Sequence, residues 1–281
     1  MDFAALIFAA VVVGTWNGEW FPSGRAEHRA HPAVEAATIT AAGAMIRAGI
    51  AAQDPGGTND LILCFNEIRD PEAAEALCAA IGRSNLTVAV VSRYRRRDRY
   101  DQQQDVIMTT LPVAFANWSW WKRTKTDQPP RGYAHAELVV TPAVTASVYA
   151  VHLKSNYGQT TAAIAESNRA KRRQAVEQLL AIEKPRRGKV RTPVLLLGDF
   201  NADPHWIADQ ELFAALEAAQ FCDALFLLTP DQRVTHPGHG KFPDSQLDYL
   251  WFRDWSAKTR PTIEPANRLS DHNAVFVTLD L

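Results

Sequence analysis

Short apolar runs and longer helical patterns alternate along this chain of 281 residues. Runs such as Asp60–Ile68 are apolar over the length of one strand, which is typical of a buried strand. Longer stretches such as Ala33–Ala52 are rich in alanine and stop at an Asp-Pro-Gly-Gly turn, as helices do. The pattern predicts strands at Val11–Trp16, Asp60–Ile68, Leu86–Ser92, Asp105–Leu111, Tyr133–Val140, Ser147–Leu153, the run from Val194, Leu247–Phe252 and Asn273–Leu279, and helices at Ala33–Ala52, Pro71–Ile81, Thr161–Ile182 and Asp209–Gln220.

Helices fall both early and late in this order, with many strands between them. Such an order predicts an α/β fold in which two sheets pack face to face with helices outside. The length suits one large domain or two small ones, and no linker is long enough to divide the chain. We therefore expect a single domain over residues 1–281, with the charged stretch Glu183–Arg191 as a surface connection.

Polar residues repeatedly stand where an apolar strand ends or begins. One such residue is an ordinary turn, because Asp and Asn side chains bond the nearby backbone. Six such strand ends indicate a polar cluster along one edge of the sheets, and its carboxylates would repel one another unless a cation or a histidine shared the site. Oxygen ligands with few cysteines favour Mg²⁺, Mn²⁺ or Ca²⁺ over zinc. The residues are Asn17, Asn66, Glu67, His152, Lys154, Ser155, Asn156, Asp199, Asn201, Asp248, Asp271, His272 and Asn273.

The motifs at these strand ends occur in a characteristic order. They read TWN at 15–17, NE at 66–67, HLKS at 152–155, GDFN at 198–201, LDY at 247–249 and SDHN at 270–273. With these motifs the sequence resembles the endonuclease/exonuclease/phosphatase superfamily from about Val11 to Leu279. The resemblance implies a four-layer α/β/β/α sandwich of two packed mixed sheets with outer helices. It also implies hydrolysis of a phosphate ester by metal-assisted in-line attack of water.

The resemblance places the metal site at acidic strand ends. Glu67 matches the family's main metal ligand, Asp271 resembles a second acidic group near the metal, and we include Asp199 among the ligands. The implied cofactor is Mg²⁺, with Mn²⁺ or Ca²⁺ as alternatives. Asn66 stands where the family more often has glutamine, which alters a neighbouring hydrogen bond and leaves the ligand in place.

The resemblance also implies roles for the residues of GDFN and SDHN. Asp199 matches the aspartate that orients or deprotonates the attacking water, and Asn201 the asparagine that contacts the phosphate. Their spacing of two puts both side chains on one face of an extended backbone, with Phe200 pointing into the core. His272 matches a histidine near the scissile phosphate. Asp248 matches the carboxylate that orients it and favours its charged form.

Other polar residues complete the predicted site. Asn17 matches an asparagine that hydrogen-bonds the site, and His152 a second histidine that some members use on the phosphate. We predict substrate contacts from a further set, with a solvated loop as the alternative. These residues are Lys154, Ser155, Asn156 and Arg95.

Local charge bears on which phosphate ester is cleaved. Thirty basic against 31 acidic residues leave a net charge of −1, unlike most domains dedicated to nucleic acid. Basic runs with aromatic residues nevertheless suit a phosphate backbone and stacked bases. These runs are SRYRRRDRY at 92–100, WSWWKRTK at 118–125 and RAKRR at 169–173. The alternative for each run is a solvated face or loop, and WSWW is alternatively part of the core packing in a strand.

We therefore expect a nuclease that acts on DNA, without stable membrane insertion and as a monomer. The alternative is a lipid or inositol phosphate hydrolase, for which WSWW is the candidate membrane-facing segment. A binding module with a dead site is a third hypothesis, disfavoured because no motif carboxylate or histidine is missing.

The remaining cysteines and histidines add no motif. Cys64, Cys78 and Cys222 show neither disulfide nor zinc spacing, and we interpret them as buried structural thiols. Among the histidines outside the motifs, His236 and His239 flank a Pro-Gly turn. We interpret that segment as a solvated loop rather than a second metal site. The others are His28, His31 and His135.

The apolar N-terminus has two interpretations. Residues 1–14 have about the length of a signal-peptide core, yet they lack a basic start and are too short for a membrane helix. They also run directly into the first motif. We favour a core strand and a cytoplasmic location, and export stays open.

Overall fold

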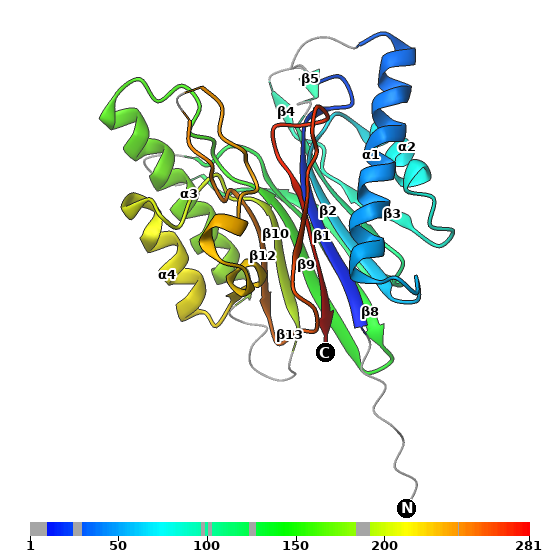
Figure 1. Cartoon of the computed structure of the whole chain (residues 1–281). Coiled ribbons are helices and arrows are strands. Elements are labelled where there is room, and N and C mark those ends of the chain that lie inside the picture. The colour runs from blue at the N-terminus through cyan, green and yellow to red at the C-terminus, as the bar shows by residue number, and fades with distance from the viewer. Residues whose placement is uncertain are drawn as a thin grey trace, which may run out of the picture.

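The computed structural model describes residues 10–24, 30–96, 99–100, 103–123, 128–183, 192–240 and 242–281. The possible signal segment, most of the connection 183–191 and His28 therefore lie largely or wholly outside the described residues. Two mixed sheets pack face to face and carry helices on their outer faces, as predicted (Figure 1).

The first sheet has the strand order β13-β15-β1-β2-β6-β3, with β14 beside β15. In this sheet β1 and β2 run parallel, whereas β15 is antiparallel to β1. Its strands are β1 (Ala10–Phe21), β2 (Asp60–Ile68), β3 (Thr87–Val91), β6 (Gln104–Thr109), β13 (Ser256–Ala257), β14 (Thr262–Glu264) and β15 (Ala274–Asp280). The parallel pair matters for the site because its two carboxyl ends lie at one edge.

The second sheet has the order β11-β12-β10-β9-β8-β7 and contains the parallel pair β9 and β10. Its strands are β7 (Val113–Trp120), β8 (Gly132–Thr141), β9 (Val144–His152), β10 (Val194–Asp199), β11 (Cys222–Asp223) and β12 (Asp248–Arg253). A separate two-stranded hairpin is formed by β4 (Arg95–Arg96) and β5 (Arg99–Tyr100). The strand β7 was not predicted: its apolar run Val113–Ala116 is exposed or only partly buried and does not belong to a core strand.

Helices α1 (Pro32–Gln53) and α2 (Pro71–Ile81) cover the first sheet, and α3 (Ala162–Glu183) and α4 (Gln210–Ala218) cover the second (Figure 1). The bounds agree with the predicted helices to within two residues. Helix α2 shows why: the Asp70 side chain caps its first turn by accepting from the amide of Ala73, and Gly82 ends it at a φ of 72°. Such an N-cap contributes about 1 kcal/mol.

Three apolar clusters fill the spaces between the four layers. One lies between the sheets, one between the first sheet and α1 and α2, and one between the second sheet and α3 and α4. Representative members are Val13 and Leu197 in the first, Ile46 and Phe276 in the second, and Val176 and Trp251 in the third. Cys64 and Cys78 are buried as predicted, whereas Cys222 is exposed.

Helix α1 has an additional property. Among the described helices it is long and apolar enough to cross a membrane by length and composition alone, a test that core helices of soluble proteins also pass. Its residues Ile46 and Ile50 are buried against the first sheet. The stretch Val11–Trp16 is the central part of strand β1, as predicted.

Candidate active site

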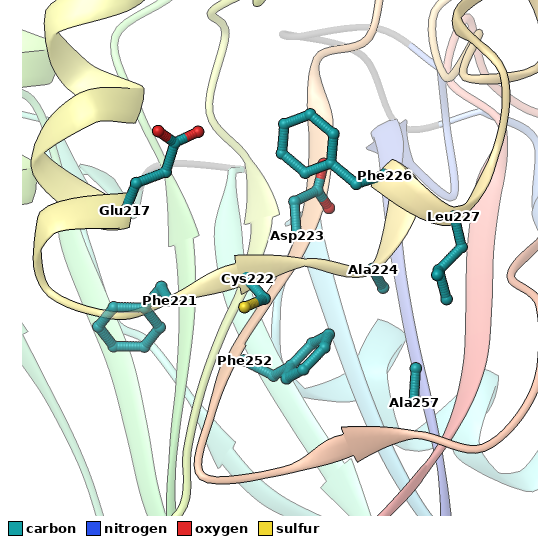
Figure 2. Close-up of a pocket in the computed structure, with 9 residues that line it drawn as sticks. All are labelled: Glu217, Phe221, Cys222, Asp223, Ala224, Phe226, Leu227, Phe252 and Ala257. Atoms are coloured by element: carbon teal, nitrogen blue, oxygen red, sulfur yellow. The ribbon is translucent and has the colours of Figure 1, made fainter.

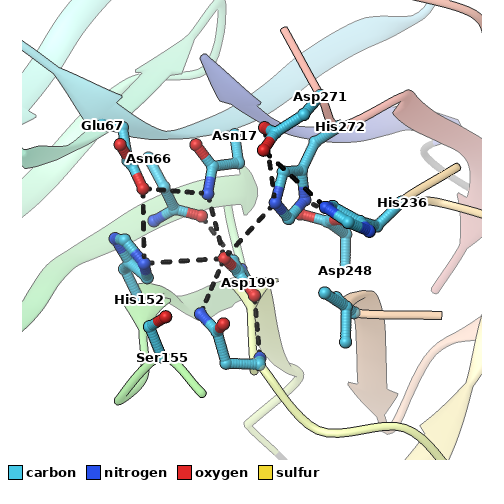
Figure 3. Close-up of polar contacts among 12 residues, drawn as sticks. Asn17, Asn66, Glu67, His152, Ser155, Asp199, His236, Asp248, Asp271 and His272 are labelled. Carbon is cyan, nitrogen blue, oxygen red and sulfur yellow. Dashed lines mark hydrogen bonds and ion pairs between the residues drawn. The ribbon is translucent and has the colours of Figure 1, made fainter. Parts of the chain in front are cut away.

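The ends of the two parallel strand pairs bring the candidate residues together (Figure 3). In the strand registers Asn17 of β1 lies beside Asn66 of β2, and His152 of β9 lies beside Asp199 of β10. Strand β12 runs antiparallel to β10, so its first residue, Asp248, also lies beside Asp199. Residues from distant parts of the chain therefore face one space at the end of the sandwich.

Two carboxylates, Glu67 and Asp199, share one amide donor. The Asn17 Nδ2 atom lies 2.9 Å from Asp199 Oδ2 and 3.4 Å from Glu67 Oε1. The other oxygen of Glu67 accepts from the backbone amide of Trp20 at 3.2 Å. Burial raises the pKa of both carboxyls, because a charge is poorly solvated there. The pair is therefore short of positive charge.

Asp199 is fixed by a chain of buried polar groups behind it. Its backbone amide donates to Asn66 Oδ1 at 3.0 Å, and Asn66 Nδ2 donates to Asp105 at 2.7 Å. The hydroxyl of Tyr94 donates to the other oxygen of Asp105 at 2.9 Å. Gly198, at a φ of 130°, permits this close approach, since a Cβ there would lie 2.1 Å from the Val151 carbonyl oxygen. The glycine of GDFN is thus required by packing.

Asn201 reaches Asp199 through a turn, which corrects the prediction of an extended backbone. Its φ is 51°, and its backbone amide donates to Asp199 Oδ1 at 2.7 Å. Its side-chain amide donates to Asp199 Oδ2 at 2.8 Å. The two side chains still face the same space, and Phe200 between them is fully buried, as predicted.

Several residues around this space have strained backbones. Five of the eight non-glycine residues with positive φ among the described residues lie here. Each such conformation costs on the order of 1–3 kcal/mol, so the surrounding structure must impose it. These residues are Glu19, Trp20, Glu67, Arg131 and Asn201.

His272 and Asp248 form a close pair. The His272 Nδ1 atom lies 2.7 Å from Asp248 Oδ2, which leaves Nε2 directed toward Asp199 Oδ2 at 3.9 Å. Burial alone would lower the pKa of His272, but the charge and hydrogen bond of Asp248, with Asp199 and Asp271, raise it to about 10. The ring is therefore an imidazolium at neutral pH.

His152 differs from His272 in its charge. Its Nε2 atom lies 3.6 Å from Glu67 Oε1 and 3.5 Å from Asp199 Oδ2. Burial, together with Arg131 and His272, lowers its pKa well below the usual value. His152 is therefore neutral and presents a nitrogen atom to the two carboxylates.

Asp271 lies beside the histidines. Its carboxylate is 3.8 Å from His272 Nε2 and 3.7 Å from His236 Nε2, and its backbone amide donates to Glu19 at 3.1 Å. The interpretation of His236 as part of a solvated loop is wrong, because its side chain is 14% exposed and its ring packs edge-on against His272. His239 is exposed, as expected.

Four residues at the site were not found from the sequence. Arg131 and Gln103, bonded to each other at 2.5 Å, both act on Glu67: the arginine charge and the glutamine hydrogen bond oppose the rise in its pKa. Glu19 is half-buried and near both Glu67 and Asp271. With His236 these residues belong to no matched motif, and only the folded chain brings them close.

The predicted substrate-contacting residues are placed differently from one another. Lys154 and Ser155 follow β9 at the site, where the Lys154 ammonium donates to the Ser155 carbonyl at 2.8 Å. Asn156 bonds the carbonyl of Asn201 at 3.3 Å. Arg95 is exposed and lies in the hairpin β4–β5 rather than at a strand end of either sheet.

The basic run RAKRR serves the fold in α3. Arg172 is buried, pairs with Asp209 at 2.7 Å and donates to Asn156 Oδ1 at 2.7 Å. Arg169 and Arg173 both pair with Glu166 at 2.9 Å. Arg169, Arg172 and Arg173 thus have acidic partners, which does not support the hypothesis that this run binds a phosphate backbone.

The donor set at Glu67 and Asp199 fits a hard divalent cation. Two buried carboxylates face one space, a neutral imidazole adds a nitrogen atom, and a cation between them would relieve their repulsion. Asp271 contacts His272, His236 and Glu19 rather than Glu67, so its role as a ligand beside Glu67 stays a prediction.

A cavity of about 370 Å³ lies elsewhere in the fold (Figure 2). It opens near Phe252, toward the opposite end of β12 from Asp248. Apolar side chains dominate its wall, and it contains none of the predicted site residues. Its lining is Glu217, Phe221, Cys222, Asp223, Ala224, Phe226, Leu227, Phe252 and Ala257.

A four-layer sandwich of this kind, with this site at one end of its sheets, is the arrangement of a superfamily of phosphoesterases. The model of the Endonuclease/Exonuclease/phosphatase family matches residues 14–272, and the chain belongs to that family. Its members hydrolyse phosphoesters and generally use divalent metals. No curated protein matches the chain.

Solved structures share the fold at low sequence identity. An endonuclease/exonuclease/phosphatase from Beutenbergia cavernae DSM 12333 is 16% identical, with a TM-score of 0.68 over 97% of this chain and 72% of that one. Sphingomyelinase C from Streptomyces griseocarneus is 17% identical, with a TM-score of 0.63 over 96% and 99%. The human Nocturnin catalytic domain is 15% identical, with a TM-score of 0.63 over 96% and 93%. These likenesses concern the fold alone.

Proposed function

We propose that the protein is a divalent-metal-dependent phosphodiesterase and acts as a nuclease on DNA. The observation that carries the proposal is the pairing of two groups around one space. A buried carboxylate pair at Glu67 and Asp199 suits a cation, and an imidazolium at His272 suits a phosphate anion. Phosphoester hydrolysis needs both, because charge develops on the phosphoryl oxygens and on the leaving oxygen.

In this proposal each side chain acts at a stated atom. Asp199 Oδ2 accepts a proton from the attacking water or orients it, and the amide of Asn17 holds that carboxylate in place. His272 donates from Nε2 toward the phosphoryl oxygens, while Asp248 fixes its ring through Nδ1. A divalent cation held by Glu67, with Mg²⁺ as our choice, supplies charge neutralisation when bound.

A surface next to the site favours nucleic acid as the substrate. The rings of Trp118 and Trp120 of β7 lie 5.7 and 5.2 Å from that of Tyr94 and 6.0 Å from each other, and Trp120 is 40% exposed. We call these three residues the aromatic shelf. Tyr94 connects it to Asp105, whose partner Asn66 bonds Asp199.

Positive charge accompanies the aromatic shelf. Exposed cations lie within three residues of the shelf in the sequence, at Arg93, Arg95, Lys122 and Arg123. Aromatic rings beside cations suit stacked bases and a phosphate backbone. The third tryptophan, Trp121, is buried in the core, so WSWW divides between packing and surface.

A second candidate function is hydrolysis of a lipid or inositol phosphate. The same edge strand favours it, because Val113, Phe115 and Trp120 are exposed apolar side chains. Tryptophan beside cations also suits the interface of an anionic membrane. The structural likeness to a sphingomyelinase keeps this class in view.

The proposal is tested with a substrate panel under controlled metal. The panel contains single-stranded, duplex and abasic DNA, RNA, sphingomyelin vesicles and a phosphoinositide, each with Mg²⁺, Mn²⁺, Ca²⁺ or EDTA. We expect cleavage of DNA with Mg²⁺ and its loss in EDTA, because the carboxylate pair needs a cation. Survival of every nucleic acid while a lipid is cleaved would establish the second candidate instead. No turnover of any substrate would indicate a binding module.

The aromatic shelf gives a separate prediction. Replacing Trp120 by alanine should raise the KM for single-stranded DNA about tenfold and change kcat little, since one stacked base is worth about 1–3 kcal/mol. Phe115→Ala is the matched control: this ring is also exposed, but it lies on the other face of β7 beside His135. Equal effects of the two substitutions would contradict a stacking role for Trp120.

A further inference from the structure

A second group of possible metal ligands lies on the other side of His272. One ligand atom each from His236, Asp271 and His272 all lie within 4.8 Å of one another. The closest approaches are 3.7 Å from His236 Nε2 and 3.8 Å from His272 Nε2 to the Asp271 carboxylate (Figure 3). Ligand atoms around a tetrahedral zinc ion lie about 3.4 Å apart, given bonds of about 2.0–2.2 Å. The two histidine nitrogens approach different oxygens of Asp271, and separations in the group reach up to 4.8 Å, so side-chain movements of about 1 Å are needed to close the three ligands around one ion.

The backbone holds His236 in this position. Thr235 accepts from the amides of Leu247 and Asp248 through its hydroxyl at 2.9 and 3.0 Å, and its carbonyl accepts from Asn273 at 2.7 Å. His236 itself exchanges two backbone hydrogen bonds of 3.0 Å with Ser245. These hydrogen bonds fix His236 next to the start of β12, where Asp248 lies, and next to the residues just before β15, where Asp271 and His272 lie.

The surroundings of His272 match those of a metal-binding histidine. Its Nδ1 bonds Asp248 at 2.7 Å, and metal-binding histidines usually donate their second nitrogen to a carboxylate in this way. Glu19 adds a further acidic group beside Asp271, and the Asp271 side chain is 40% exposed, which leaves a path for an ion. Two imidazole nitrogens and one carboxylate favour a transition metal over Mg²⁺.

We propose that His236, Asp271 and His272 bind a transition-metal ion of the Zn²⁺ type, at a site distinct from the Glu67–Asp199 pair. The ion takes the place of the proton on His272 Nε2, which is released to solvent. Occupation therefore removes the Nε2–H donor that the proposed function directs at the phosphate, and so inhibits hydrolysis. The inhibition rests on the proposed function, whereas the binding does not.

The test measures Zn²⁺ binding directly, without substrate. The EDTA-treated full chain is titrated with ZnCl₂ by calorimetry in excess Mg²⁺, which occupies the hard-oxygen site. We expect one Zn²⁺ bound by the wild type, and His236→Gln to weaken it at least tenfold. His239→Gln is the matched control, because this exposed histidine of the same loop lies outside the cluster. It should bind as the wild type does.

The outcomes separate this inference from the proposed function. Absence of zinc binding, or equal binding by the wild type and His236→Gln, overturns the site. Loss of binding in His239→Gln equal to that in His236→Gln also overturns it, since the ion would then bind the loop alone. Asp271→Asn replaces His236→Gln if the latter does not fold. Zinc that binds as expected without inhibiting any phosphoesterase activity overturns only the inhibitory role.

Discussion

Replacing Asp199 by asparagine is expected to lower phosphodiester turnover by roughly 10²-fold or more, because a group that accepts a proton from water contributes about that much. The amide keeps the shape of the side chain and an oxygen that can accept from Asn17, but it has no charge to attract a proton. The measurement is kcat at saturating Mg²⁺ on the substrate that the panel identifies.

Stability distinguishes this loss from unfolding. Burial raises the pKa of Asp199 in the folded chain, so its ionised form opposes folding above that pKa. At pH 8 without metal, Asp199→Asn gains stability by removing this buried charge and loses stability because one acceptor for the amides of Asn17 and Asn201 is gone, so its free energy of unfolding should stay close to that of the wild type. Asp203→Asn is the matched control in the same loop: its carboxylate bonds the amides of His205 and Gln246, so stability should fall while turnover stays within a few-fold. An active Asp199→Asn would contradict the role.

The strands and helices were predictable because their signals are local. The predicted segments Asp60–Ile68 and Pro71–Ile81 match β2 and α2 in both bounds. The residues that begin and end each element are visible in the local sequence, as the limits of an apolar run and as a proline at the helix start. The strand β7 was missed for the converse reason. It is an edge strand with one neighbour, and both its faces are largely exposed, so its apolar residues do not mark a buried face.

The site residues also differ in whether a local sequence signal indicates them. Residues such as Glu67 and His272 stand in motifs at strand ends and were found from those motifs. Arg131 and His236 reach the site through loops whose course depends on the whole fold, and no local pattern indicates it. Asn201 lies between these cases: its proximity to Asp199 follows from the spacing, but the left-handed turn that creates the contact does not.

The arrangement of charge explains why the site needs its scaffold. Glu67 and Asp199 are buried with raised pKa values, and several neighbouring backbones have positive φ. Both features oppose folding. The free energy that offsets them comes from the strands and helices that pack in the three apolar clusters. Activity and stability therefore conflict at these residues, as they commonly do in enzymes.

Replacing His272 by alanine should lower kcat by about 10²–10³-fold, as removal of one donor to a developing oxyanion does. The backbone carbonyl of His272 still accepts from Trp16 and its amide still bonds Ser270, but the buried Asp248 carboxylate loses its partner, so the thermal midpoint should fall. The thermal midpoint and kcat are measured together. A large fall in kcat at a temperature well below the variant's midpoint, where it is fully folded, supports the role, whereas wild-type kcat contradicts it.

Asp248→Asn tests the charge on His272 through pH. The pKa of His272 is raised to about 10 chiefly by Asp248, against the lowering effect of burial, so the wild-type ring stays charged from pH 6 to 9. Without the carboxylate this pKa falls, and the imidazolium is lost as pH rises through the new value. Turnover of Asp248→Asn should then decline about tenfold per pH unit above it, while the wild type shows no such decline from His272. A variant profile parallel to the wild type would mean that the charge of His272 plays no part in the reaction.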